Sequence, residues 1–181
     1  MPIQRQEVLA AAREIVGRYG LADLTMRRLA GELGVQPSAL YWHVESKQAL
    51  LAQLADDLLA DVPLPSARKR WDHQLHDLGA ALRRTLLAQR DGAEIVSAGH
   101  ASALGSSHLG KRLVEIAELG GCSHTLACAA RDALLHFVIG FTLDEQTHSL
   151  MAAHGAAPAR VHDSDAQFEA ALGVVVAGVR T

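Results

Sequence analysis

The sequence predicts an all-α protein, and three observations support this prediction. Apolar residues recur at three- and four-residue intervals along most of the 181 residues, as they do on the buried side of an amphipathic helix. Alanine, leucine and valine dominate the apolar set, and aromatic residues make up only 4% of the chain, a composition that favours helices. No alternation of apolar and polar residues is long enough to indicate a strand.

Four helices are expected in the first third of the chain. The spacing of apolar residues predicts a helix over 4–19, with Gly20 at its C-terminal end. Thr25 suits the N-cap of a second helix that ends near residue 33 with Gly34 as its stop, and Pro37 suits the first turn of a third. Ser46 suits the N-cap of a fourth helix, which is expected to reach about residue 61.

The expected domain boundary follows this fourth helix. Pro63 and Pro65, followed by the basic run 68–70, interrupt the helical pattern. We therefore expect one domain over 1–62 and a larger helical domain over 63–181. In the second domain the pattern predicts helices near 71–89, 91–97, 107–119, 123–149 and 165–179, and a loop over 152–164.

Charge and cysteine content limit the class of protein. The net charge is −3, which argues weakly against binding nucleic acid by bulk charge. We expect Cys122 and Cys128 to be reduced, buried thiols of a cytoplasmic protein, because they lack a second pair. No apolar run approaches the length needed to cross a bilayer and no signal peptide is evident, so no membrane partner is expected.

Residues 33–44, LGVQPSALYWHV, raise the question of function. Two helices joined by a short turn containing glycine form a helix-turn-helix. Successive residues of a helix point about 100° apart, so Tyr41, Trp42 and His43 cannot all face one core. Outward-facing side chains on a short helix could enter a DNA major groove. The alternative is that Tyr41 and Trp42 pack against the neighbouring helices.

Residues 21–59, LADLTMRRLAGELGVQPSALYWHVESKQALLAQLADDLL, resemble the DNA-binding region of the tetracycline repressor (TetR) family. Further downstream, 86–93 (LLAQRDGA), His136-Phe137 and 143–148 (LDEQTH) resemble landmarks of a TetR-type C-terminal domain. The resemblance implies a three-helix DNA-binding domain with a helix-turn-helix, followed by a ligand-binding and dimerisation domain. It also implies a transcriptional regulator, expected to be a repressor, that binds a pseudo-palindromic double-stranded operator as a homodimer.

The resemblance also assigns the residues that would contact DNA. Arg27 falls where a family arginine reads a guanine edge. Ser38, Ala39 and Trp42 fall at base-contacting positions, and Ala39 can offer only a methyl group. The positions that resemble phosphate-backbone contacts are Thr25, Tyr41, His43 and Lys47. An activator, or a regulator without ligand control, remains the alternative reading.

The implied effector pocket departs from that of drug-binding family members. Polar and metal-holding positions there correspond to Leu78, Val96 and Leu113 here, and an aromatic one to Leu82. We therefore expect a hydrophobic or amphipathic small-molecule effector, bound without a metal or other cofactor. Two further expected pocket residues are Arg131, which either binds an anionic group or pairs with an acid near Asp132 or Glu145, and Phe137.

Three remaining expectations concern metal, dimerisation and catalysis. A shifted metal site near His100, Asp144 and Glu145 stays open, whereas His73 and His76 are expected to be ordinary side chains. Helices 123–149 and 165–179 are expected to form a four-helix bundle between two subunits. The expected seam is the stripe Phe168, Leu172, Val175, Val176 and Val179. No phosphate loop, nucleophile elbow or helical zinc-protease motif indicates an enzyme.

Overall fold

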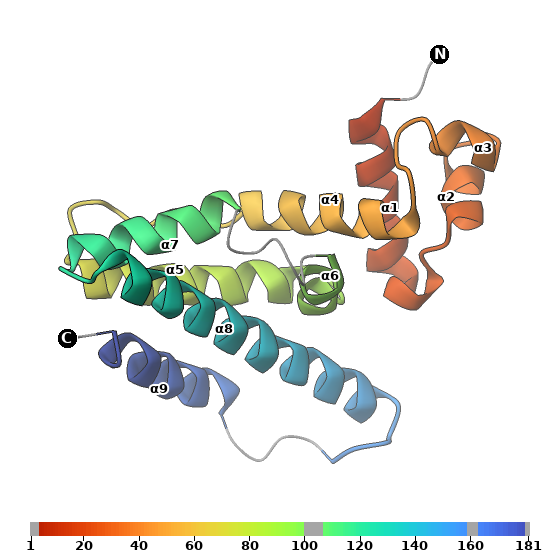
Figure 1. The fold of residues 1–181 in the computed structure, drawn as a ribbon. Helices are drawn as coiled ribbons and strands as arrows, with labels where there is room; N and C mark the ends of the chain where they lie inside the picture. Colours follow the sequence, from red (N-terminus) through yellow and green to blue (C-terminus); the bar gives the residue numbers. More distant parts are fainter. Residues whose placement is uncertain (1–3, 100–106, 159–162, 180–181) are drawn as a thin grey trace.

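The computed structural model describes residues 4–99, 107–158 and 163–179 of the chain. Within these ranges all regular elements are helices, so the all-α prediction is confirmed. Figure 1 shows their arrangement. The helices are α1 Arg5–Tyr19, η1 Leu21–Asp23, α2 Met26–Glu32, α3 Pro37–Leu40, α4 Lys47–Ala60, α5 Trp71–Ala88, α6 Gly92–Gly99, α7 His108–Leu119, α8 His124–Ala153 and α9 Ser164–Ala177.

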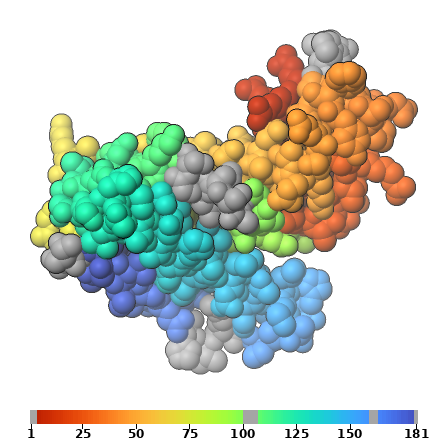
Figure 2. All heavy atoms as spheres, in the orientation of Figure 1, coloured from red at the N-terminus to blue at the C-terminus, as the bar shows by residue number. Residues whose placement is uncertain are grey.

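Helices α1 to α3 form a lobe at one end of the molecule, and α4 runs from this lobe to the body (Figures 1 and 2). The side chain of Arg13 on α1 joins the lobe to α4, because its guanidinium lies 3.0 Å from Asp57 Oδ2 and 2.7 Å from Asp61 Oδ2. Buried residues of both helices, among them Ile15 and Leu54, belong to one apolar core. The start of α4 is therefore held at the lobe while its end enters the body.

The body is a stack of α5, α7, α8 and α9 with the short α6 against α4. The aromatic core lies between α8 and α9, where the rings of Phe137 and Phe168 stack with centroids 5.5 Å apart and Phe141 meets Phe168 edge-on at 5.3 Å. Phe168 is fully buried. The aromatic residues of the C-terminal half thus fasten α9 to α8 within one subunit.

A buried ion pair crosses the same region. Arg83 on α5 donates from Nε to Glu145 Oε2 at 2.8 Å and from Nη2 to Glu145 Oε1 at 2.6 Å. It also donates from Nη2 to Asp165 Oδ1 on α9 at 2.7 Å. Its guanidinium lies 4.6 Å from the centre of the Phe168 ring. One side chain therefore ties together three helices of the body.

The predicted dimer seam on α9 is wrong in its residues. Phe168, Leu172, Val176 and Val179 are buried within the subunit, so this stripe packs α9 onto its own α5 and α8. Val175 is half-buried against the same core, whereas the neighbouring Val174 is 73% exposed. The periodicity identified the buried face of α9 correctly, but it could not distinguish burial inside a subunit from burial between subunits.

Two smaller expectations also need correction. Helix α8 has 30 residues and is long and apolar enough, by length and composition, to cross a membrane. It is nevertheless packed against α5, α6, α7 and α9, as expected of a core helix. Cys122 is a buried free thiol, as expected, but Cys128 is only half-buried.

Candidate nucleic-acid interface and ligand domain

The α2–turn–α3 unit has the local chemistry of a helix-turn-helix. The Thr25 hydroxyl accepts a hydrogen bond from the Arg28 amide at 3.1 Å and so caps α2. Gly34 follows α2 with φ +67°, a left-handed conformation that glycine adopts without strain. Pro37 then occupies the first turn of α3. Leu40 and Val44 are buried, and they seat α3 on the lobe as the sequence predicts.

The bulky residues after α3 face outward. Trp42 is 88% exposed and Tyr41 is 53% exposed. The alternative in which these two side chains pack against neighbouring helices is therefore wrong for this subunit. Ser38 is also exposed, whereas Ala39 and His43 are half-buried. Tryptophan, tyrosine and arginine are enriched among the residues that contribute most to binding at protein interfaces, so this exposed pair suits a contact surface.

Two adjacent arginines of α2 have different environments. Arg28 forms an ion pair with Asp23 and its guanidinium lies 4.3 Å from the centre of the Tyr19 ring. Arg27 is exposed and forms no ion pair with any residue that the structure describes. Both line a hollow of about 430 Å³ together with Asp23 and Thr25. Arg27 is thus the cation of this pair that is available for a partner.

Lys47 lies at the start of α4. Ser46 caps that helix by accepting from the Ala49 amide at 3.0 Å, and Lys47 is its exposed first residue. The free amides of a helix N-terminus and an ammonium group both attract an anion. The arrangement suits a phosphate of the DNA backbone.

The residues expected to line the effector pocket are mostly packed. Leu78, Leu82 and Leu113 are each 1% exposed, and Val96 is fully buried. Phe137 is half-buried and stacks on the fully buried Phe168. The four aliphatic residues belong to one apolar core, and their role in an effector site stays a prediction.

Arg131 and the carboxylates near it form pairs of their own. Arg131 donates from Nε to Asp132 Oδ1 at 2.8 Å, which raises the pKa of Arg131 and lowers that of Asp132. The alternative in which Arg131 pairs with an acid is therefore confirmed for Asp132.

Glu145, bound by Arg83, is not available for the shifted metal site, and His100 lies outside the described residues. Among residues with described placement, no group of three or more potential ligands is positioned to hold a metal ion.

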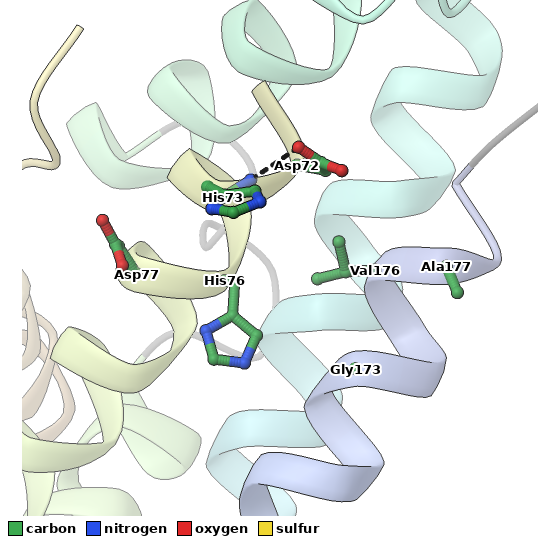
Figure 3. Close-up of a pocket in the computed structure, with 7 residues that line it drawn as sticks. All are labelled: Asp72, His73, His76, Asp77, Gly173, Val176 and Ala177. Atoms are coloured by element: carbon green, nitrogen blue, oxygen red, sulfur yellow. Dashed lines mark hydrogen bonds between the residues drawn. The ribbon is translucent and has the colours of Figure 1, made fainter. Parts of the chain in front are cut away.

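A separate groove lies between α5 and α9. It has a volume of about 370 Å³ and an apolar wall formed by Gly173, Val176 and Ala177 of α9 (Figure 3). The α5 wall includes His76, whose Nε2 lies 3.0 Å from Glu169 Oε2 on α9. None of the predicted effector residues lines this groove.

The body contacts the lobe through the turn between α5 and α6. Asp91 in this turn, which has φ 55°, accepts a hydrogen bond at Oδ2 from the Leu21 amide at 2.7 Å. Gln146 on α8 holds the turn: its Nε2 donates to Leu86 O at 3.1 Å and to Gln89 O at 2.8 Å, and its Oε1 accepts from the Ala93 amide at 3.1 Å. We name this set the α8–turn–η1 contact.

One half of this contact has a signal in the sequence. Asp91 lies in the segment 86–93 and Gln146 in the segment 143–148. Both segments resemble a TetR-type C-terminal domain. Asp91 directly before Gly92 is typical of a turn residue whose side chain binds the backbone, whereas Gln146 stands among the polar residues of 144–149 and carries no such signal. Only the fold shows that the two segments meet.

Family models match most of the chain. Residues 8–54 match the model of bacterial regulatory proteins of the tetR family, and residues 64–159 match the tetracyclin repressor-like C-terminal domain. The class D tetracycline repressor protein of Escherichia coli is 35% identical over 161 residues, covering 81% of this chain and 68% of the relative. The chain belongs to the TetR family.

Solved structures of TetR-family proteins agree with the fold. BioQ of Mycobacterium smegmatis is 41% identical, with a TM-score of 0.86 over 98% of this chain and 97% of that one. A BioQ structure with its double-stranded DNA operator is 38% identical, with a TM-score of 0.83 over 98% of each chain. This TetR-family chain is therefore a helix-turn-helix transcriptional regulator with a C-terminal regulatory domain.

Proposed function

We propose that this chain represses transcription by binding a pseudo-palindromic operator as a homodimer and that an apolar small molecule releases it. The observation that most supports DNA binding is the 88% exposure of Trp42 beside α3. Arg27 on α2 and Lys47 at the start of α4 are exposed cations. The relative BioQ, 38% identical, has been crystallised with its operator.

The proposed contacts separate into two kinds. Arg27 reads the O6/N7 edge of a guanine, and Ser38, Ala39 and Trp42 meet base edges, where the Ala39 methyl favours thymine. The DNA phosphates are bound by Lys47, Thr25, Tyr41 and His43, and these contacts set the register of the protein on the duplex. Two such lobes in a dimer would lie about 34–36 Å apart to enter successive major grooves.

The dimer seam is proposed on the outward faces of α8 and α9. Ala133 and Gly140 of α8 and Ala170 of α9 are exposed, and Val174 is 73% exposed. Small residues allow helices to approach closely in a four-helix bundle. We place the boundary between the two domains in the connector after α4, which gives domains 1–62 and 63–181.

The effector is proposed to bind among Leu78, Leu82, Val96, Leu113 and Phe137, with Arg131 at the edge of the site. The buried aliphatic side chains would leave the polar groups of a drug–magnesium chelate unpaired, at about 1–3 kcal/mol for each group. A hydrophobic or amphipathic ligand bound without metal fits these residues better. Calorimetry with and without EDTA tests this, because chelator-sensitive binding of tetracycline would contradict it.

Release of DNA is proposed to use the α8–turn–η1 contact and the junction of α4 with α6. A Cβ atom added at Gly99 of α6 would lie 2.5 Å from Leu51 O of α4, and Gln48 Nε2 donates to Ala98 O at 2.6 Å. The end of α6 and α4 must therefore move together. An effector lowers operator affinity tenfold only if it binds the released conformation about 1.4 kcal/mol more tightly.

Fluorescence anisotropy with DNA from upstream of the gene tests operator binding. Arg27→Ala should weaken specific binding by about 1–3 kcal/mol and relax the preference at one base pair. Lys47→Ala should weaken binding to all sequences and reduce the salt slope by about one. Lys111→Ala, an exposed change on α7, is the matched control. Equal affinity for upstream and scrambled DNA would refute the proposal.

Two further points are proposed on family grounds. TetR-family regulators are intracellular, and we propose a cytoplasmic location for this one. We also propose that the chain has no enzymatic activity, since the similar proteins are regulators.

A further inference from the structure

The connector between α4 and α5 forms a groove with the outer side of α5. The groove has a volume of about 320 Å³ and is distinct from the one between α5 and α9. It is lined by Pro63, Leu64, Pro65, Lys69, Asp77, Ala80, Ala81 and Arg84. This volume reaches the lower end of the range found for small-molecule sites.

The residue types in the apolar part of the groove keep it open without a ligand. Pro63 and Pro65 fix the backbone dihedral φ on one wall. Ala80 and Ala81 have short side chains on the other wall and leave space above α5. Leu64, which follows Pro63 in the sequence, also lines the groove and is 49% exposed, so an apolar ligand there would remove its side chain from water. Burial of apolar area of this kind is the main source of affinity for a small amphipathic molecule.

The polar part of the groove carries excess positive charge. Lys69 Nζ lies 2.6 Å from Asp77 Oδ2, which neutralises that pair. Arg84 is exposed and forms no ion pair or hydrogen bond with any part of the chain that the structure describes. The guanidinium presents several fixed N–H donors in a plane that matches a carboxylate. The groove thus combines an apolar wall with one unpaired cation.

We infer that this groove binds a small organic carboxylate with a short apolar chain. The carboxylate would pair with Arg84, and the chain would lie against Leu64 and the two prolines. The site differs from the proposed effector pocket, because 77, 81 and 84 lie on a different side of α5 from Leu78 and Leu82. The inference therefore does not depend on the proposed effector.

The position of the groove gives such a ligand a route to the DNA-binding lobe. The connector continues directly from α4, whose first residue is Lys47. A ligand that joins the connector to α5 restricts the movement of α4 relative to the body. Its effect on operator affinity equals the difference in its affinity for the two positions of α4.

Octanoate is the probe for the full-length protein, with octanol and octylamine as neutral and cationic comparators. The Kd of octanoate should be on the order of 1 mM, given its size. Titration should shift the methyl NMR signals of Leu64, which the Leu64→Ala variant identifies. Octanoate should bind more tightly than octanol, and octylamine should bind most weakly.

Charge variants separate this site from nonspecific adsorption. Arg84→Gln should weaken octanoate binding by up to about fivefold, the upper end of the range for an exposed ion pair, and Arg84→Lys should retain most of the affinity. Lys111→Gln, which makes the same change of net charge on α7, should have no effect. Octylamine binding as tightly as octanoate, unshifted Leu64 methyl signals or equal losses in the Arg84→Gln and Lys111→Gln variants would overturn the inference.

Discussion

The ion pair of Arg83 with Glu145 makes a quantitative prediction about the stability of the body. Only 8% of the Arg83 side chain and 10% of the Glu145 side chain are exposed, and two hydrogen bonds of 2.8 and 2.6 Å join them. Both hydrogen bonds stabilise the charged form of Arg83, so its pKa is raised. Arg83→Met removes the cation and leaves the carboxylate of Glu145 buried without it.

The expected cost of Arg83→Met is about 3–5 kcal/mol, because an uncompensated charge remains in the interior. Glu145→Leu should cost less, about 1–3 kcal/mol, since Arg83 keeps its bond to Asp165 at 2.7 Å. The double variant removes both buried charges and puts apolar side chains of similar size in their place. Its stability should lie within about 1 kcal/mol of the original chain.

Urea denaturation at one fixed protein concentration measures these costs, because the stability of a dimer depends on its concentration. Asp165→Asn provides the control. The Asp165 side chain is 80% exposed, so its loss should cost no more than about 1 kcal/mol. If the costs of the two single variants simply add in the double variant, the charges are not coupled and the reasoning from burial is refuted.

Three other predictions follow from individual contacts. Asp91→Gly keeps the left-handed backbone but removes the acceptor of the Leu21 amide. That amide should therefore lose protection from hydrogen exchange, and operator affinity should fall severalfold. Unchanged protection would contradict the α8–turn–η1 contact. Asp132→Asn should lower Tm at neutral pH, because Arg131 stabilises the charged carboxylate and lowers the pKa of Asp132. The difference in Tm between the variant and the original chain should shrink as the pH falls below the ordinary aspartate pKa of about 3.8, where the carboxylate becomes protonated. Val174→Asp should produce monomers in light scattering, with Lys111→Asp as control, whereas a persistent dimer would place the seam elsewhere.

Local chemistry allowed most of the fold to be predicted from the sequence. Thr25 and Ser46 cap the helices that follow them, and Gly34 and Pro37 mark the turn between α2 and α3. Such signals act within four residues, so they need no knowledge of the tertiary structure. The short η1 after Gly20 was missed, because three residues carry no periodicity.

Side-chain environment was harder to predict than secondary structure. The stripe on α9 shows the limit: Leu172 and Val176 have the spacing of a buried face, but spacing does not reveal whether the covering surface belongs to the same subunit. The sequence around Arg83 gives no indication of its ion pairs either, since its partners Glu145 and Asp165 are 62 and 82 residues away. Long-range pairing depends on the packing of whole helices, which the spacing of residues along a single sequence does not specify.

The α8–turn–η1 contact combines a local turn with long-range side-chain contacts. Gln146 binds three backbone groups of one turn, and Asp91 extends from that turn to the Leu21 amide. Hydrogen bonds to backbone groups fix position more strictly than apolar packing does, because they depend on direction as well as distance. A shift of α8 therefore moves the turn, and the turn moves the helix that precedes α2. Since Arg27 lies on α2, a change in the regulatory body can alter its position relative to a base pair without any change within the helix-turn-helix itself.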